Sequence, residues 1–268
     1  MRATWLTDIH LNFLRPLALK AFYDRVKAEK PDAVLITGDI AEGDSVHRYV
    51  AELADHVGKP TYFVLGNHDY YRSNIRVVRG DIVRASKRAT YLPAVGPVQL
   101  TPRVVMIGVD GWGDARCGDL ASTVQLSDWK LIEDFKKSRV DRDARLELLQ
   151  RLGTAEARTL SEKLAAVPET PELLVLTHVP PFPGACVYDG EVSSPAWQPW
   201  FTCIATGEVL AQYAAEHPGQ QITVLCGHSH GLGTYQHAPN LVVRTGGWPP
   251  HVEGYGNPVV QATLELAR

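Results

Sequence analysis

Residues 61–69 read TYFVLGNHD, an apolar segment that ends abruptly in a glycine, an asparagine, a histidine and an aspartate. The first five residues are β-branched or aromatic apart from one leucine, a composition that predicts a buried strand. Gly66 then predicts a tight turn out of that strand. Asn67, His68 and Asp69 can each bind a metal or move a proton, so the pattern indicates a chemical site at the end of a strand.

The same arrangement recurs along the chain. Helical periodicity over residues 16–30 and 45–57 lies between apolar segments, and this alternation favours an α/β layered fold. Five of the predicted strands run directly into polar residues, and the carboxyl ends of parallel strands share the sheet edge at which ligands bind. The predicted strands are residues 3–7, 33–37, 61–65, 104–109, 172–177, 222–226 and 241–245.

Seven side chains that can bind metals follow these strands and are expected to converge. They combine carboxylate and amide oxygens with imidazole nitrogens, a mixture that suits Mn, Fe or Zn better than Ca. Seven ligands exceed what one tetrahedral ion takes. Two divalent metal ions that share a bridging carboxylate, about 3.5–4 Å apart, fit the set better. The seven residues are Asp8, His10, Asp39, Asn67, His178, His228 and His230.

Composition restricts the function only weakly. The 268 residues are 45% hydrophobic and 21% charged, as in an ordinary globular protein, and the formal net charge is -3. This balance gives no indication of a nucleic acid or a membrane surface as partner. The chain shows no signal peptide and no apolar stretch long enough to span a membrane, so a cytoplasmic location is expected. The four cysteines form no CxxC pair, which argues against a zinc knuckle or a disulfide framework.

The stretch from residue 113 to residue 166 interrupts the alternation of strands and helices. It is rich in charge, and its leucines recur with helical spacing, with Ser127 and Thr154 as expected N-caps. A helix that ends near Val167 would serve as the crossover to the next strand. We interpret residues 113–150 as a helical cap inserted into a single domain of residues 1–268.

The motifs, taken in order, resemble those of the calcineurin-like metallophosphoesterase superfamily. The resemblance extends over residues 8–230, and each block follows a predicted strand. The five blocks are DxH (Asp8, His10), GD (Gly38, Asp39), GNHD (Gly66 to Asp69), a histidine before prolines (His178) and GHxH (Gly227 to His230).

The resemblance implies a fold, a ligand set and a mechanism. The fold is a four-layered αββα sandwich with two mixed β-sheets. A hydroxide or water that bridges the metals is the nucleophile, and His68 is the general acid that protonates the leaving group. By position, Asp8, His10 and His230 would hold the first metal, Asn67, His178 and His228 the second, and Asp39 would bridge the two.

His68 can act as an acid only if it keeps a proton beside two dications, which by themselves lower its pKa. A neighbouring carboxylate would counter this effect. Asp69, Glu42 and Asp44 are the candidates in the sequence, and the sequence does not choose among them.

The function that follows is hydrolysis of phosphate esters, either monoesters or diesters. A phosphorylated small molecule or a nucleotide is the expected substrate, with Asn67, Arg72 and His251 as candidate contacts. The alternative is a non-catalytic scaffold that binds metals and partners with the same fold. The sequence indicates neither the native metals nor the oligomeric state.

Overall fold

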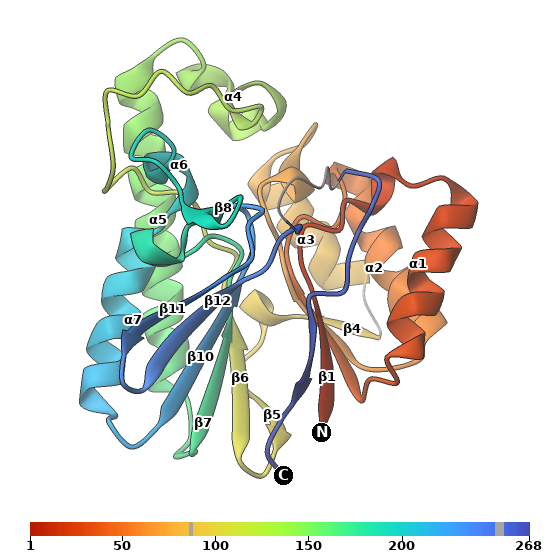
Figure 1. Ribbon diagram of the computed structural model, residues 1–268. Helices are drawn as coiled ribbons and strands as arrows, with labels where there is room; N and C mark the ends of the chain where they lie inside the picture. The colour runs from red at the N-terminus through yellow and green to blue at the C-terminus, as the bar shows by residue number, and fades with distance from the viewer. Residues whose placement is uncertain (86–87, 250–254) are drawn as a thin grey trace.

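The computed structural model, which describes residues 1–85, 88–249 and 255–268, contains two mixed sheets that pack face to face (Figure 1). The first has the order β13 (Ala262–Glu265), β1 (Arg2–Leu6), β2 (Ala33–Thr37), β3 (Thr61–Val64), β4 (Ala89–Tyr91). The second has the order β11 (Gly233–Ala238), β12 (Leu241–Thr245), β10 (Gln221–Cys226), β7 (Glu172–Leu176), β6 (Val104–Gly108), β5 (Val98–Thr101). Strands β1 to β4 are parallel, as are β12, β10, β7 and β6, whereas β13, β11 and β5 are antiparallel edge strands.

Helices cover the outer face of each sheet. Helices α1 (Pro16–Ala28), α2 (Val46–Val57) and α3 (Ile75–Ala85) pack on the first sheet, and α5 (Arg142–Ala165) and α7 (Ile204–Glu216) pack on the second (Figure 1). Trp5, Leu35 and Leu176 belong to the apolar layer between the sheets. The predicted four-layered αββα sandwich is therefore confirmed.

All seven predicted strands are present, each within one residue of its predicted bounds. The strands that the sequence did not reveal are edge strands and a small hairpin, β8 (Val187–Tyr188) with β9 (Glu191–Val192). Edge strands are exposed on one side and need no continuous apolar run, so they carry little signal in the sequence.

The segment from residue 113 onward forms α4 (Asp128–Leu131), a 3-10 helix (Glu133–Ser138) and then α5 as one continuous helix. Thr154 is therefore not an N-cap: its Oγ1 donates to the carbonyl of Gln150 at 2.7 Å within α5. Asp141 caps this helix instead, because its side chain accepts from the backbone of Ala144. Residue 150, the predicted end of the insertion, lies inside α5. None of the helices in the described ranges is both long and apolar enough to cross a membrane.

The core between the sheets yields a test of the fold. Leu35 is fully buried there, whereas Leu17 on α1 is 86% exposed. We expect Leu35→Ala to lower the free energy of unfolding by about 2–5 kcal/mol, because the cavity leaves neighbouring side chains without contacts. Leu17→Ala should change it by less than about 0.5 kcal/mol. Urea denaturation followed by circular dichroism measures both, and equal effects would contradict the described packing.

Candidate metal centre

The polar side chains that follow the parallel strands lie together at the carboxyl edges of the two sheets. Five of them occupy the left-handed region of the backbone, which turns the chain sharply as it leaves each strand. Asp and His are among the residues that enter this region most readily, at a cost of roughly 1–2 kcal/mol each. The φ angles are 50° for Asp8, 40° for His10, 52° for Asp39, 68° for His228 and 62° for His230.

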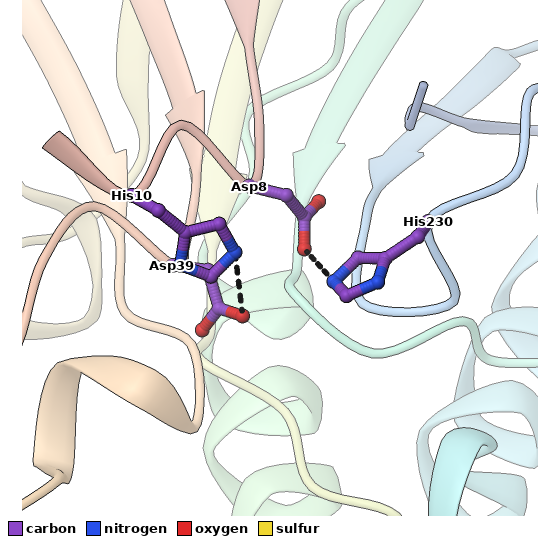
Figure 2. A group of neighbouring side chains, drawn as sticks. All are labelled: Asp8, His10, Asp39 and His230. Carbon is purple, nitrogen blue, oxygen red and sulfur yellow. Dashed lines mark ion pairs between the residues drawn. The ribbon is translucent and has the colours of Figure 1, made fainter. Parts of the chain in front are cut away.

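Four of the predicted ligands form one compact group. Side-chain atoms of Asp8, His10, Asp39 and His230 that could bind a metal all lie within 4.8 Å of one another (Figure 2). Asp8 Oδ1 is 3.3 Å from His230 Nε2, and Asp39 Oδ2 is 3.8 Å from His10 Nε2. Both ring nitrogens of His10 and Asp39 Oδ2 are buried and have no hydrogen-bond partner among the described residues. Such unsatisfied buried groups fit a site that binds a cation.

Asp8 is held in place by its neighbours. Its carboxylate accepts hydrogen bonds from Thr7 Oγ1 at 2.7 Å and from the backbone N–H of His228 at 3.1 Å. Burial by itself would raise the pKa of Asp8, but the contact with His230 and the nearby histidines hold that pKa below its usual value. Asp8 is accordingly ionised and ready to bind a metal.

A second group lies on the other side of Asp39. His178 Nδ1 donates to the carbonyl of Thr37 at 2.7 Å, because a carbonyl can only accept. Burial lowers the pKa of His178, so the ring is neutral and Nε2 carries a lone pair. This lone pair points to Asn67 Oδ1 at 3.1 Å and to Asp39 Oδ1 at 3.4 Å. Asn67 cannot turn its amide N–H toward His178, since Nδ2 donates to Asp128 Oδ1 at 2.9 Å.

Three atoms that can accept a hydrogen bond or bind a metal thus face one another. A cation would satisfy all three, so this group also fits a metal. Asp39 takes part in both groups, Oδ1 in the second and Oδ2 in the first.

His228 stands beside the second group, with its ring centroid 5.0 Å from that of His178. Its Nε2 donates to the backbone carbonyl of Trp200 at 3.2 Å, which leaves Nδ1 as the atom free to bind a metal. Phe201, from α6 (Gln198–Phe201), stacks on the His228 ring at 4.3 Å. Partners of this kind fix the tautomer and the orientation of metal-binding histidines.

Sequence reasoning missed these supporting partners. Every residue has a backbone carbonyl, so the residue type of Trp200 does not indicate that its carbonyl binds His228. Asp128 could not be distinguished in the sequence from the many other charged residues of the predicted cap. In the structure it is buried at the start of α4 and also accepts a hydrogen bond from Tyr71 OH at 2.7 Å.

His68 lies at the edge of the first group. Its Nε2 is 3.9 Å from Asp39 Oδ2, and its ring stacks on Tyr71 with centroids 4.2 Å apart. Burial, followed by the charges of His230 and His178, lowers the pKa of His68 to about 3. The Nδ1 atom of His68 is buried and has no hydrogen-bond partner among the described residues.

The carboxylate that faces His68 is that of Asp39, and none of the three candidates from the sequence takes this place. Asp69 accepts three backbone N–H bonds, from Ile40, Ala41 and Gly66, each 2.8–2.9 Å long. It ties the loop after β2 to the loop after β3, and burial raises its pKa to about 7. Glu42 bonds to Arg72 at 2.9 Å, and Asp44 is exposed.

The two remaining candidate contacts are Arg72 and His251. The side chain of Arg72 is 73% exposed and paired with Glu42. His251 lies outside the residues that the structure describes.

Gly66 offers a test of the geometry at the centre. A Cβ at this position would lie 2.2 Å from Asp39 Oδ1 and 2.6 Å from the Asp39 backbone nitrogen. We expect Gly66→Ala to displace Asp39, to cost about 1–3 kcal/mol of stability through overpacking, and to lower manganese affinity at least about tenfold. Calorimetric titration with Mn²⁺ measures the affinity.

Gly96→Ala is the matched control, because a Cβ there meets no described atom within 4 Å. Equal manganese affinity in the two variants would contradict the tight approach of Gly66 to Asp39.

Both the sequence and the fold of this chain are similar to those of known proteins. The model of the calcineurin-like phosphoesterase family matches residues 1–232. Phosphopantetheinyl hydrolase from Mycobacterium tuberculosis is similar in structure, with 17% identity, a TM-score of 0.65, and coverage of 92% of this chain and 89% of that chain. A dimetal phosphatase from Danio rerio has 13% identity and a TM-score of 0.57, with 92% and 87% of the respective chains covered. At these identities the likeness shows the fold. No curated protein sequence matches significantly.

Proposed function

Because the chain belongs to the calcineurin-like phosphoesterase family, we propose that it is a dinuclear-metal-dependent hydrolase of phosphate esters. The observation that carries this proposal is the position of Asp39. Its two carboxylate oxygens face two separate groups of ligand atoms, at 3.8 Å from His10 on one side and 3.4 Å from His178 on the other. A carboxylate shared in this way is typical of a site for two metals.

Each of the two groups of side chains would hold one of the two proposed metals. Asp8, His10 and His230 would hold the first metal, Asn67, His178 and His228 the second, and Asp39 both. The mixed oxygen and nitrogen donors suit Mn, Fe or Zn. When bound, two dications supply an activated water nucleophile and neutralise the charge on a phosphoryl group.

His68 is the proposed general acid. It lies beside Asp39 but belongs to neither set of ligands, so its Nε2 remains available to the leaving oxygen. Burial lowers the pKa of the ring, and the Asp39 carboxylate, 3.9 Å from Nε2, is the neighbour that would favour the protonated form. The stack on Tyr71 fixes the ring in this orientation. A positioned acid of this kind contributes about 10²–10⁴ to the rate.

The segment of residues 113–150 is the proposed cap within a single domain. Asp128 from this segment holds Asn67, and the carbonyl of Trp200 holds His228, so the second group is covered on that side. A centre closed on one side favours small monoesters over diesters or macromolecules, and we propose a phosphorylated small molecule as substrate. Asn67 and Arg72 stay candidates for contacts with it.

Metal removal tests the proposed activity. We expect the chelated protein to be inactive and the Mn²⁺-loaded protein to hydrolyse p-nitrophenyl phosphate faster than bis-p-nitrophenyl phosphate. Asp39→Asn should lose both metals and all activity, because one carbonyl oxygen cannot replace a bridging carboxylate. Elemental analysis counts the metals. Two bound metals with hydrolysis of neither ester would overturn the proposal and favour a non-catalytic scaffold.

His68→Ala tests the acid. We expect it to keep two metals and to lose about 10²–10⁴ in kcat for an alkyl phosphate, whose leaving group needs a proton. The loss for p-nitrophenyl phosphate should be much smaller, since p-nitrophenolate leaves without one. The exposed His47 on α2 provides the control variant His47→Ala. Loss of metal from His68→Ala, or equal losses for both substrates, would rule out this role.

A further inference from the structure

We propose that the cavity beside His230 binds the alcohol part of the substrate, and that this part is apolar and carries no anionic group. The proposal rests on the function proposed above and specifies its substrate class. The cavity has a volume of about 830 Å³, large enough for a small organic group, and His230 and Ser229 form part of its wall. It therefore opens directly at the first group of ligands.

Apolar side chains line this cavity and are exposed to it. Tyr188 is 63% exposed, Val192 53% and Trp197 44%, and Phe201 also contributes to the wall. Trp197 packs edge-on against Phe201 with ring centroids 5.5 Å apart, and Phe201 in turn stacks on His228. A continuous aromatic surface thus leads from the second group of ligands to the outside. Exposed apolar side chains gathered in one cavity are typical of a ligand site.

The hairpin β8–β9 is built to present this wall. Asp189 and Gly190 form its two-residue turn, with φ of 49° and 85°, as a tight hairpin requires. Tyr188 pairs with Glu191 across the hairpin, so both side chains lie on the same face. The base of the hairpin lies against the chain just after His230, because a Cβ on Gly231 would be only 2.3 Å from the Val187 carbonyl.

The charge of the cavity restricts what can bind. Asp189 and Glu191 belong to its lining, and the described lining residues include no lysine or arginine. Residues 186–201 as a whole contain these two acids and no basic residue. A carboxylate or second phosphate in the alcohol part would meet the like charge of Glu191. The phosphoryl group itself would lie at the metal centre, outside this cavity.

The test compares three phosphate monoesters with similar alkyl leaving groups: ethyl phosphate, 2-phenylethyl phosphate and its 4-carboxy derivative. We expect the Mn²⁺-loaded protein to show a kcat/KM for 2-phenylethyl phosphate at least about tenfold above that for the other two. Trp197→Ala should reduce this preference to less than about threefold, mainly by raising KM. Glu191→Gln should raise kcat/KM for the carboxy derivative relative to 2-phenylethyl phosphate.

Val140→Ala, at a residue 96% exposed and outside the cavity lining, is the control and should preserve the preference. Calorimetry with 3-phenylpropylphosphonate and propylphosphonate repeats the comparison without turnover, and the phenyl compound should bind about tenfold more tightly. Hydrolysis of all three esters with equal efficiency, or a preference that Trp197→Ala leaves intact, would overturn this inference but not the proposed function. Hydrolysis of none of them, with tight binding of the phenyl phosphonate, would overturn the proposed function alone.

Discussion

The hydrogen bond from His178 Nδ1 to the carbonyl of Thr37 is the contact on which the centre depends. It joins the two sheets, and it also fixes the orientation of a candidate metal ligand. Thr37 ends β2 in the first sheet, and His178 follows β7 in the second. A donor is required at this carbonyl, so the lone pair of the ring must lie on Nε2, toward Asn67 and Asp39. The backbone N–H of His228, bonded to Asp8, makes a second such link. The edges of the sheets are thus held together by the groups that would bind the metals.

A buried ionic network supports this joint from behind. Asp110, which follows β6, accepts from the backbone of Leu65 at 2.8 Å and from Tyr70 OH at 2.7 Å, on both sides of the GNHD block. Arg79 on α3 bonds to Asp110 at 2.8 Å and also to Glu156 on α5. Helices from opposite outer layers are therefore connected to the loop that carries Asn67 and His68. Removal of Arg79 would leave the buried carboxylates of Asp110 and Glu156 without the cation that pairs with both, which is strongly destabilising.

Much of the fold could be predicted from the sequence, because buried parallel strands are continuous apolar runs and Gly66 and Gly38 end them sharply. The same pattern predicted that the seven candidate ligands converge, and the structure brings Asp8, His10, Asp39 and His230 into one group. The carboxylate beside His68 could not be predicted, because Asp39 is 29 residues away in the sequence. Only the parallel pairing of β2 with β3 brings Asp39 next to His68. The continuity of α5 was missed because threonine is a usual N-cap residue, so Thr154 was expected to begin a separate helix. In the structure Gly153 permits the close approach of Asp114, and Thr154 Oγ1 donates to the carbonyl of Gln150 within the same helix.

The hairpin β8–β9 is attached to the rest of the chain at its base. Its base is fixed by the Val187 backbone against Gly231 and by the bond from Ser193 N–H to the Cys186 carbonyl at 2.7 Å. These contacts involve backbone and a glycine, so they tolerate changes of side chain in the rest of the hairpin. Tyr188, Glu191 and Val192 can therefore mutate with little effect on the ligand set or the core. Side chains of this hairpin can thus change independently of the chemical centre beside it, and a library confined to the hairpin is a natural starting point for altering selectivity by directed evolution.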